Sequence, residues 1–226
     1  SMNPFRYKAD ILPVIFFVLC FSLDIYFYLT MESIIFFLLY LPLSIIVKWF
    51  ISAWNHHHQH VQTFSVPILN RLLEVIYGFQ TGIVGYGWVL HHNLGHHIHY
   101  LDQTQDESAW KSPAGKRYHP FVYTIIVTMT AYYRSWKVGK KFPQIQRYFL
   151  SMCALQVVLL TLLILYKPLA GTLIFLVPMI TSLFLTVYTT YHHHSGLDTS
   201  DPHEASYNID ARWYNFLTGN LWYHTA

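Results

Sequence analysis

Two apolar runs lie close together near the start of the chain, "ILPVIFFVLCFSLDIYFYLT" (11–30) and "SIIFFLLYLPLSIIVKWFIS" (33–52). A helix needs about 20 mostly apolar residues to cross the hydrocarbon core of a bilayer, and each run has that length. Two later runs also qualify, "YFLSMCALQVVLLTLLILY" (148–166) and "LAGTLIFLVPMITSLFLTVYTTY" (169–191). Because only two residues separate the members of each pair, the sequence predicts four transmembrane helices in two hairpins.

The composition agrees with a membrane protein. Hydrophobic residues make up 54% of the 226-residue chain and charged residues 11%, whereas a soluble domain carries about 25% charged residues. The formal net charge of +3 gives no reason to expect a nucleic-acid partner. Cys20 and Cys153 lie in apolar runs and are too few for a disulfide scaffold or a zinc ribbon. We therefore expect an all-α integral membrane protein with a single membrane-embedded domain over residues 1–226.

The region between the predicted hairpins contains two less clear apolar stretches, 66–90 and 121–133. If 66–90 crossed the bilayer, the histidines before and after it would face opposite sides, and 121–133 is too short to span comfortably. We therefore expect both stretches to form interfacial helices. Asp24 is the one acid inside a predicted span. Such acids are often functional, but Asp24 could equally be solvated or hydrogen-bonded at the interface, and we assign it no role.

The basic residues indicate the orientation in the membrane. Arg6 and Lys8 precede the first span, Lys48 ends the second, and further basic residues extend from Arg71 to Arg147. Only Lys167 falls in a loop on the other side. By the positive-inside rule, both termini and the central region are predicted to be cytoplasmic, in a bacterial inner membrane or the endoplasmic reticulum.

Histidines form four clusters outside the predicted spans. These are "WNHHHQH" (54–60), "HHNLGHHIH" (91–99), "YHHHSGL" (191–197) and "NLWYHTA" (220–226). The first three clusters each follow an apolar run, so the hairpin topology would gather all four onto one membrane face. His56 and His60 are four residues apart and would share one face of a helix, and His92 and His96 repeat that spacing. Neutral imidazole is a good ligand for iron, zinc, copper and nickel, so the clusters predict an imidazole-rich site for two metal ions.

Two other interpretations of these histidines are less favoured. A lone interfacial histidine is usually a polar tip at the headgroup level, but four clusters on one face favour metal binding. A metal transporter would need ionisable ligands within the spans, along a pathway. The predicted spans contain no histidine, so the transporter is only a remote alternative.

Together, these motifs resemble the histidine boxes of the membrane fatty-acid desaturase and hydroxylase superfamily. "HHHQH" resembles the first box, "HNLGHH" the second, "HHSGL" the segment after the last span, and "NLWYHTA" the start of the closing box. The resemblance covers essentially the whole chain, with Trp222 where the family commonly has glycine. It implies the metal ligands His56, His60, His92, His96, His97, His194 and His224. It also suggests neighbours that could orient the ligands, namely His57, His193, Asp106, Asn215 and Asn220. Asp106 could instead be a solvated loop acid, and the two asparagines could cap helices.

The resemblance implies a reaction class and its partners. Family members use two non-haem irons and dioxygen, and zinc can replace the iron in isolated protein. The reaction would be desaturation of a fatty-acyl chain, with hydroxylation of an alkyl or sphingoid chain as the alternative. The chain has no cysteine cluster for iron–sulfur and no haem or flavin domain, so a separate ferredoxin- or cytochrome-type electron donor is implied. The basic residues Lys137, Lys140, Lys141 and Arg147 suit docking of an acidic donor or anchoring to anionic lipid.

The last eight residues, "GNLWYHTA" (219–226), do not contain the final histidine pair of a closing box. We therefore expect the sequence to be incomplete at its C-terminus. On that expectation, the 226-residue form would bind metal incompletely and would be inactive.

Overall fold

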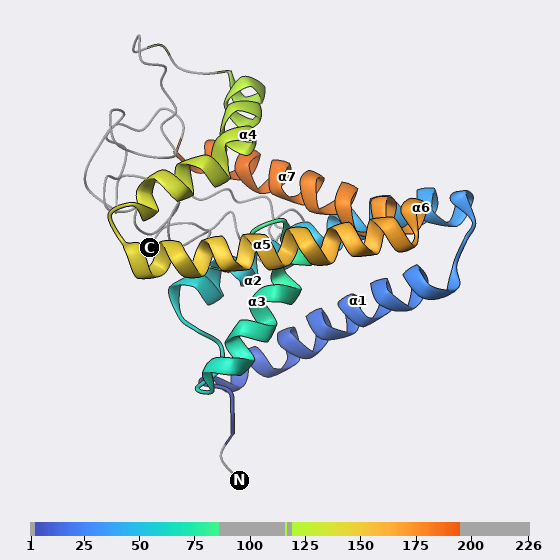
Figure 1. Ribbon diagram of the computed structural model, residues 1–226, viewed down its shortest axis with the longest axis horizontal. Helices are drawn as coiled ribbons and strands as arrows, with labels where there is room; N and C mark the ends of the chain where they lie inside the picture. The colour runs from blue at the N-terminus through green and yellow to red at the C-terminus, as the bar shows by residue number, and fades with distance from the viewer. Residues whose placement is uncertain (1–2, 86–115, 117–118, 195–226) are drawn as a thin grey trace. The chain divides into compact units, whose positions relative to one another are not determined.

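The computed structural model describes residues 3–85, 116 and 119–194 (Figure 1). Within these residues, four helices are long and apolar enough to cross a membrane. They are Lys8–Thr30, Ile34–Gln59, Pro143–Tyr166 and Pro168–Thr189. The described chain is therefore helical, with the four spanning segments that the apolar runs predict.

The first two spanning helices follow one another closely. A short 3₁₀ turn, η1 (Lys8–Asp10), leads into α1 (Ile11–Thr30), whose bounds match the first apolar run. The Ser33 side chain accepts a hydrogen bond from the backbone N–H of Phe36 and so caps α2 (Ile34–His60). α2 extends well beyond the predicted end at residue 52, because hydropathy marks the apolar part of a helix and not its last turn. The histidine cluster thus lies on the final turns of α2.

Both ambiguous stretches contain a helix, but in 66–90 the helix ends at Thr81, residues 82–85 are not helical, and 86–90 lie outside the described residues. α3 (Pro67–Thr81) begins with proline at its first position and ends at Gly82, whose φ of 73° is left-handed. Glycine takes this conformation without steric cost, so it terminates the helix cleanly. α4 (Pro120–Gly139) begins after His119, whose ring Nδ1 accepts from the N–H of Phe121. The interfacial placement of both helices stays a prediction.

The last part of the described chain is α5 (Pro143–Tyr166) followed by a helical run with a π-helical interruption. This run comprises α6 (Pro168–Ala170), the π-helical segment η3 (Gly171–Leu176) and α7 (Val177–His194). The π-helical interruption lies directly before Pro178. This proline has no N–H to donate to the carbonyl of Ile174, and a proline ring crowds the carbonyl four residues earlier, so the α-helical hydrogen-bond pattern cannot continue there. In keeping with this, the Val177 N–H donates to Thr172, five residues back.

The chain divides into two compact units. The first comprises the described residues up to Gly85 together with Ser151–Ser182, and the second comprises the described residues of 86–150 and 183–226. In the first unit, α2 packs against α3 and η3, and α1 packs against the same two elements. Two apolar clusters form its core, one centred on Phe37, Ile174 and Phe175, and the other on Phe17 and Tyr77.

The spanning helices expose large apolar side chains. Leu12 is 78% exposed, Leu39 75% and Leu165 72%. Extended exposed apolar surface is a liability in water, but it is what a bilayer requires of the lipid-facing side of a helix. The exposure pattern therefore agrees with the apolar composition of the four helices.

A buried polar network crosses the interior of the first unit. Asp24 of α1 and Lys48 of α2 are 2% and 1% exposed, and Lys48 Nζ lies 3.0 Å from Asp24 Oδ2. Tyr40 Oη donates to Asp24 Oδ1 at 2.5 Å, and Gln80 Nε2 of α3 donates to Asp24 Oδ2 at 3.3 Å. Lys48 Nζ also donates to the carbonyl oxygen of Ile174 in η3 at 2.8 Å. We call these five residues the Asp24–Lys48 network.

The network corrects the interpretation of two residues. Asp24 is not solvated, because its carboxylate accepts from three side chains inside the protein. Lys48 is not a surface cation at the end of a span, because α2 continues past it and its ammonium group is buried. Lys48 therefore does not belong in the count of positive residues that suggests orientation.

Candidate metal centre at the end of α2

The first histidine cluster lies on the last turns of α2, where successive residues are about 100° apart around the helix axis. His56 is half-buried and His57 is exposed, whereas His58 is 1% exposed. Because His58 is two residues from both His56 and His60, it lies on the opposite side of the helix from them. The helix thus confirms that His56 and His60 share one face, and it separates them from His58.

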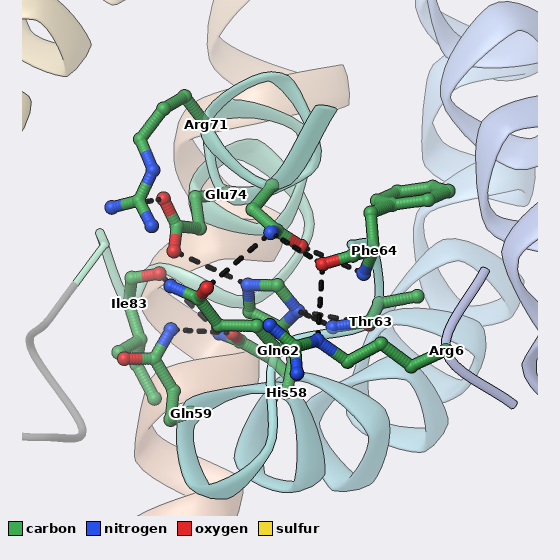
Figure 2. Close-up of polar contacts among 11 residues, drawn as sticks. Arg6, His58, Gln59, Gln62, Thr63, Phe64, Arg71, Glu74 and Ile83 are labelled. Carbon is green, nitrogen blue, oxygen red and sulfur yellow. Dashed lines mark hydrogen bonds and ion pairs between the residues drawn. The ribbon is translucent and has the colours of Figure 1, made fainter. Parts of the chain in front are cut away.

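His58 is held by contacts on both ring nitrogens (Figure 2). The backbone N–H of Thr63 donates to Nδ1 at 3.2 Å, and the Thr63 hydroxyl lies 2.9 Å from the same atom. A backbone N–H can only donate, so Nδ1 carries no proton and the ring proton is on Nε2. Nε2 then donates to Glu74 Oε1 at 3.2 Å. Both nitrogens are occupied, so His58 is not available as a metal ligand in this arrangement.

Glu74 links this histidine to the edge of the first unit. Its side chain is 2% exposed, and its Oε2 lies 3.2 Å from Arg71 Nη1, which belongs to a 25% exposed side chain. We call His58, Thr63, Glu74 and Arg71 the His58–Glu74 network. It joins the buried side of α2 to α3 and neutralises the buried carboxylate with a cation that reaches water.

The chain between α2 and α3 is held by a second set of hydrogen bonds. The Phe64 N–H donates to Asn70 Oδ1 at 2.9 Å, and Asn70 Nδ2 donates back to the Phe64 carbonyl at 2.9 Å. Arg6 Nε donates to the same carbonyl at 3.2 Å (Figure 2). These bonds fix the turn that follows the histidine cluster.

Asn55 holds α2 at the other end of α3. Its amide nitrogen donates to Thr81 Oγ1 at 2.9 Å and to the Ile83 carbonyl at 3.4 Å, and its Oδ1 accepts from Gln59 Nε2 at 3.4 Å. Asn55 is fully buried. The buried side of α2 therefore contacts both ends of α3, and the opposite side carries His56.

Tyr77 of α3 packs beside the His58 ring, with 5.7 Å between the ring centroids. Burial raises the pKa of the Tyr77 phenol, and the charge of Asp10 raises it further. The phenol therefore stays protonated at neutral pH, and its ring is part of the buried packing around His58.

The model of one protein family, fatty acid desaturase, matches residues 32–226. The chain belongs to the fatty acid desaturase family. No curated protein and no solved structure matches it. Family membership makes this protein an oxidoreductase of the desaturase or hydroxylase type, and its four apolar helices make it an integral membrane protein.

The matched range of this desaturase-family chain contains every predicted ligand. Four of them, together with three of the predicted neighbours, lie outside the described residues: His92, His96, His97, His224, Asp106, Asn215 and Asn220. His193 and His194 form the end of α7, which extends past the predicted end of the last span. Within residues 3–85, 116 and 119–194, no three His, Cys, Asp or Glu side chains are grouped so that they could hold a metal ion.

Sequence reasoning missed the two buried networks of this family member. A signal for the first was present, because Lys48 and Asp24 are charged residues within apolar runs. A signal for the second was the middle position of His58 in "HHHQH", which a helix turns away from its outer histidines. Neither signal identifies the partner, because Gln80, Glu74 and Ile174 come from other helices.

Proposed function

We propose that the protein is a di-iron, oxygen-dependent fatty-acyl desaturase that introduces a double bond into the alkyl chain of a lipid. The observation that carries the proposal is the family match over residues 32–226, which includes all four histidine clusters. Family membership alone covers both desaturation and hydroxylation, so hydroxylation of an alkyl or sphingoid chain is the alternative on the same scaffold.

The proposed ligands are His56, His60, His92, His96, His97, His194 and His224. His57, His193, Asp106, Asn215 and Asn220 are proposed to orient them or a metal-bound water. The geometry of α2 supports the first pair, because His56 and His60 are one turn apart on the side away from the His58–Glu74 network. The donor chemistry fits iron, since imidazole suits this metal and thiolate ligands are absent from the set.

Iron bound there would supply the activation of dioxygen needed to remove hydrogen from an unactivated C–H bond. The task of the protein is to hold the histidine-bearing helices in place, aim one segment of the acyl chain and exclude water. α2 does the first through its buried side, where Asn55 and His58 bind α3. Zinc could replace iron in isolated protein without changing the ligand set.

We further propose a single membrane-embedded domain over residues 1–226, with two membrane hairpins and interfacial helices. Both termini and the metal site would lie on the cytoplasmic side. The distribution of basic residues supports this orientation even without Lys48. A separate ferredoxin- or cytochrome-type donor would supply the electrons, and Lys137, Lys140 and Lys141 near the α4–α5 turn are candidates for its docking.

The Asp24–Lys48 pair does not favour the remote alternative of a metal transporter. An ion pathway needs anionic or neutral ligands within the spans. Here the ammonium group of Lys48 lies 3.0 Å from the carboxylate of Asp24 and neutralises it. We therefore keep the enzyme as the proposal.

Product analysis tests this function. The full-length protein, produced with a proven electron donor in cells whose lipids lack the product, should introduce a new double bond into extracted acyl chains. An oxygenated product would indicate the hydroxylase, and unchanged lipids would contradict both reactions. His96→Ala should abolish turnover and lower the iron content while the helical fold is retained. His119→Asn is the matched control, because His119 caps α4 and asparagine can cap equally well.

A further inference from the structure

The Asp24–Lys48 network joins four elements of the first unit at one point. Asp24 comes from α1, Tyr40 and Lys48 from α2, Gln80 from α3, and the Ile174 carbonyl from η3. Two of these elements lead directly to predicted ligands, since α2 ends at His60 and η3 runs into α7, which ends at His194. The network therefore holds α2, the helix that carries the first histidine cluster, against three other elements of the first unit.

Lys48 binds a specific carbonyl on the second of these helices. Pro178 cannot donate to Ile174, so this carbonyl lacks the donor that an uninterrupted α-helix would supply. Lys48 Nζ provides a donor at 2.8 Å and also lies 5.9 Å from the centre of the Phe175 ring. A slip of α2 along η3 would move the ammonium group away from this carbonyl and from the Asp24 carboxylate. The contact therefore specifies one position of α2 along η3, which we call the register.

A second contact strengthens this register one turn further along α2. The Ser52 hydroxyl donates to the Lys48 carbonyl at 3.1 Å, and its oxygen lies 3.2 Å from the hydroxyl oxygen of Ser182 in α7. Ser52 is 1% exposed and Ser182 is fully buried. Two buried polar contacts thus link α2 to the η3–α7 run, at Ile174 and at Ser182.

We propose that Lys48 is a positioning residue, which sets the register of α2 against η3 and the first turns of α7 and so positions the first histidine cluster along the axis of α2 within the first unit. This role rests on the proposed function, because that function assigns the metal ligands His56 and His60 to α2. A buried charged group is a costly way to hold helices together, but it discriminates strongly between alternative packings. A slip of one helical turn would move a terminal histidine by about 5.4 Å, which is more than twice a metal–imidazole bond of about 2 Å.

Cysteine cross-linking measures the register without depending on activity. In a Cys20→Ala, Cys153→Ala background, Ser52→Cys with Ser182→Cys should cross-link readily under mild oxidation in native membranes. Adding Lys48→Met with Asp24→Asn removes both charges and leaves no unpaired ion. We expect the cross-linking rate to fall at least several-fold while the protein remains folded. An unchanged rate in this neutral variant would overturn the proposal.

Activity then distinguishes positioning from simple stability. In the full-length protein, the neutral variant should keep its thermal stability in detergent but change the position of the double bond or the ratio of desaturated to hydroxylated product. Lys167→Met is the matched control, because Lys167 Nζ also donates to a helix carbonyl, that of Leu29 at 3.1 Å, yet does not link α2 to α7. Unchanged products in a folded neutral variant would contradict the role of Lys48. Absence of any product from the wild type would contradict the proposed function. The cross-linking rates would still show whether Lys48 sets the register of α2, because they do not depend on activity.

Discussion

The two buried networks that include residues of α2 differ in how their charges are compensated. In the Asp24–Lys48 network, both ionic groups are at most 2% exposed, and they pair with each other at 3.0 Å. In the His58–Glu74 network, the buried carboxylate is paired with Arg71, which is 25% exposed. Within the apolar part of the bundle the protein must neutralise charge by itself, whereas near the end of α2 water shares this task. We infer that the first network sets the register of α2 and that the second anchors the end of α2 to α3.

The largest expected effect is a difference in turnover and bound iron between variants of His56 and of His58, which lie on opposite sides of α2. His56→Ala should lower turnover by more than about 100-fold and reduce bound iron, because loss of a ligand exceeds the cost of losing a residue that only orients one. His58→Ala should destabilise the protein but leave more iron bound, since both nitrogens of His58 are used by Thr63 and Glu74. Iron content and turnover, measured on folded protein, check this prediction. Equal loss of iron in both variants would break the distinction between the two sides.

Unpairing the intramembrane charge should have the next largest effect. Lys48→Met alone leaves the Asp24 carboxylate buried without its cation, and breaking a buried ion pair in this way costs about 3–5 kcal/mol. Adding Asp24→Asn should recover most of that loss. The free energy of unfolding in detergent is the measurement, and a single variant as stable as the wild type would show that the pair is not ionised.

The corresponding change in the His58–Glu74 network should cost less. Glu74→Leu leaves the Nε2–H of His58 buried without an acceptor, at about 1–3 kcal/mol, while Arg71 can turn to water. Glu74→Gln keeps an acceptor and should lose less than Glu74→Leu. The unfolding free energies of the two variants give the order. A cost for Glu74→Leu larger than that of Lys48→Met would reverse the comparison between the networks.

The smallest effect tests the link between Lys48 and the π-helical segment. Pro178→Ala restores an N–H that can donate to the Ile174 carbonyl, so Lys48 should lose part of its role there. A double-mutant cycle of Lys48→Met and Pro178→Ala should therefore give a coupling free energy of about 1 kcal/mol. Additive effects would mean that Lys48 acts through Asp24 alone.

Much of the fold could be predicted because its signals are local. The bounds of α1 match the first apolar run, and each of the other three runs became a helix long enough to span a membrane. The ends were less accurate, since α2 extends to His60 and α5 begins at Pro143. An apolar run marks only the part of a helix that lies within the hydrocarbon core, whereas the backbone hydrogen bonds of the helix can continue into the interface.

The candidate site could be predicted only in part. The i, i+4 spacing placed His56 and His60 on one face of a helix, and α2 confirms that placement. Sequence alone did not show that His58 belongs to a separate network, because Thr63 and Glu74 reach it through the turn and α3. The remaining predicted ligands stay predictions.

The sequence by itself determined the spanning helices, the helical spacing of the first histidine cluster and the family. These depend on length, hydropathy and residue order, which are properties of continuous segments. Only the tertiary structure decided that Lys48 pairs with Asp24, that it donates to the Ile174 carbonyl, to which Pro178 cannot donate, and which nitrogen of His58 carries the proton. The physical reason is that a buried polar group needs a partner within hydrogen-bonding distance, and that partner is fixed by which helices become neighbours.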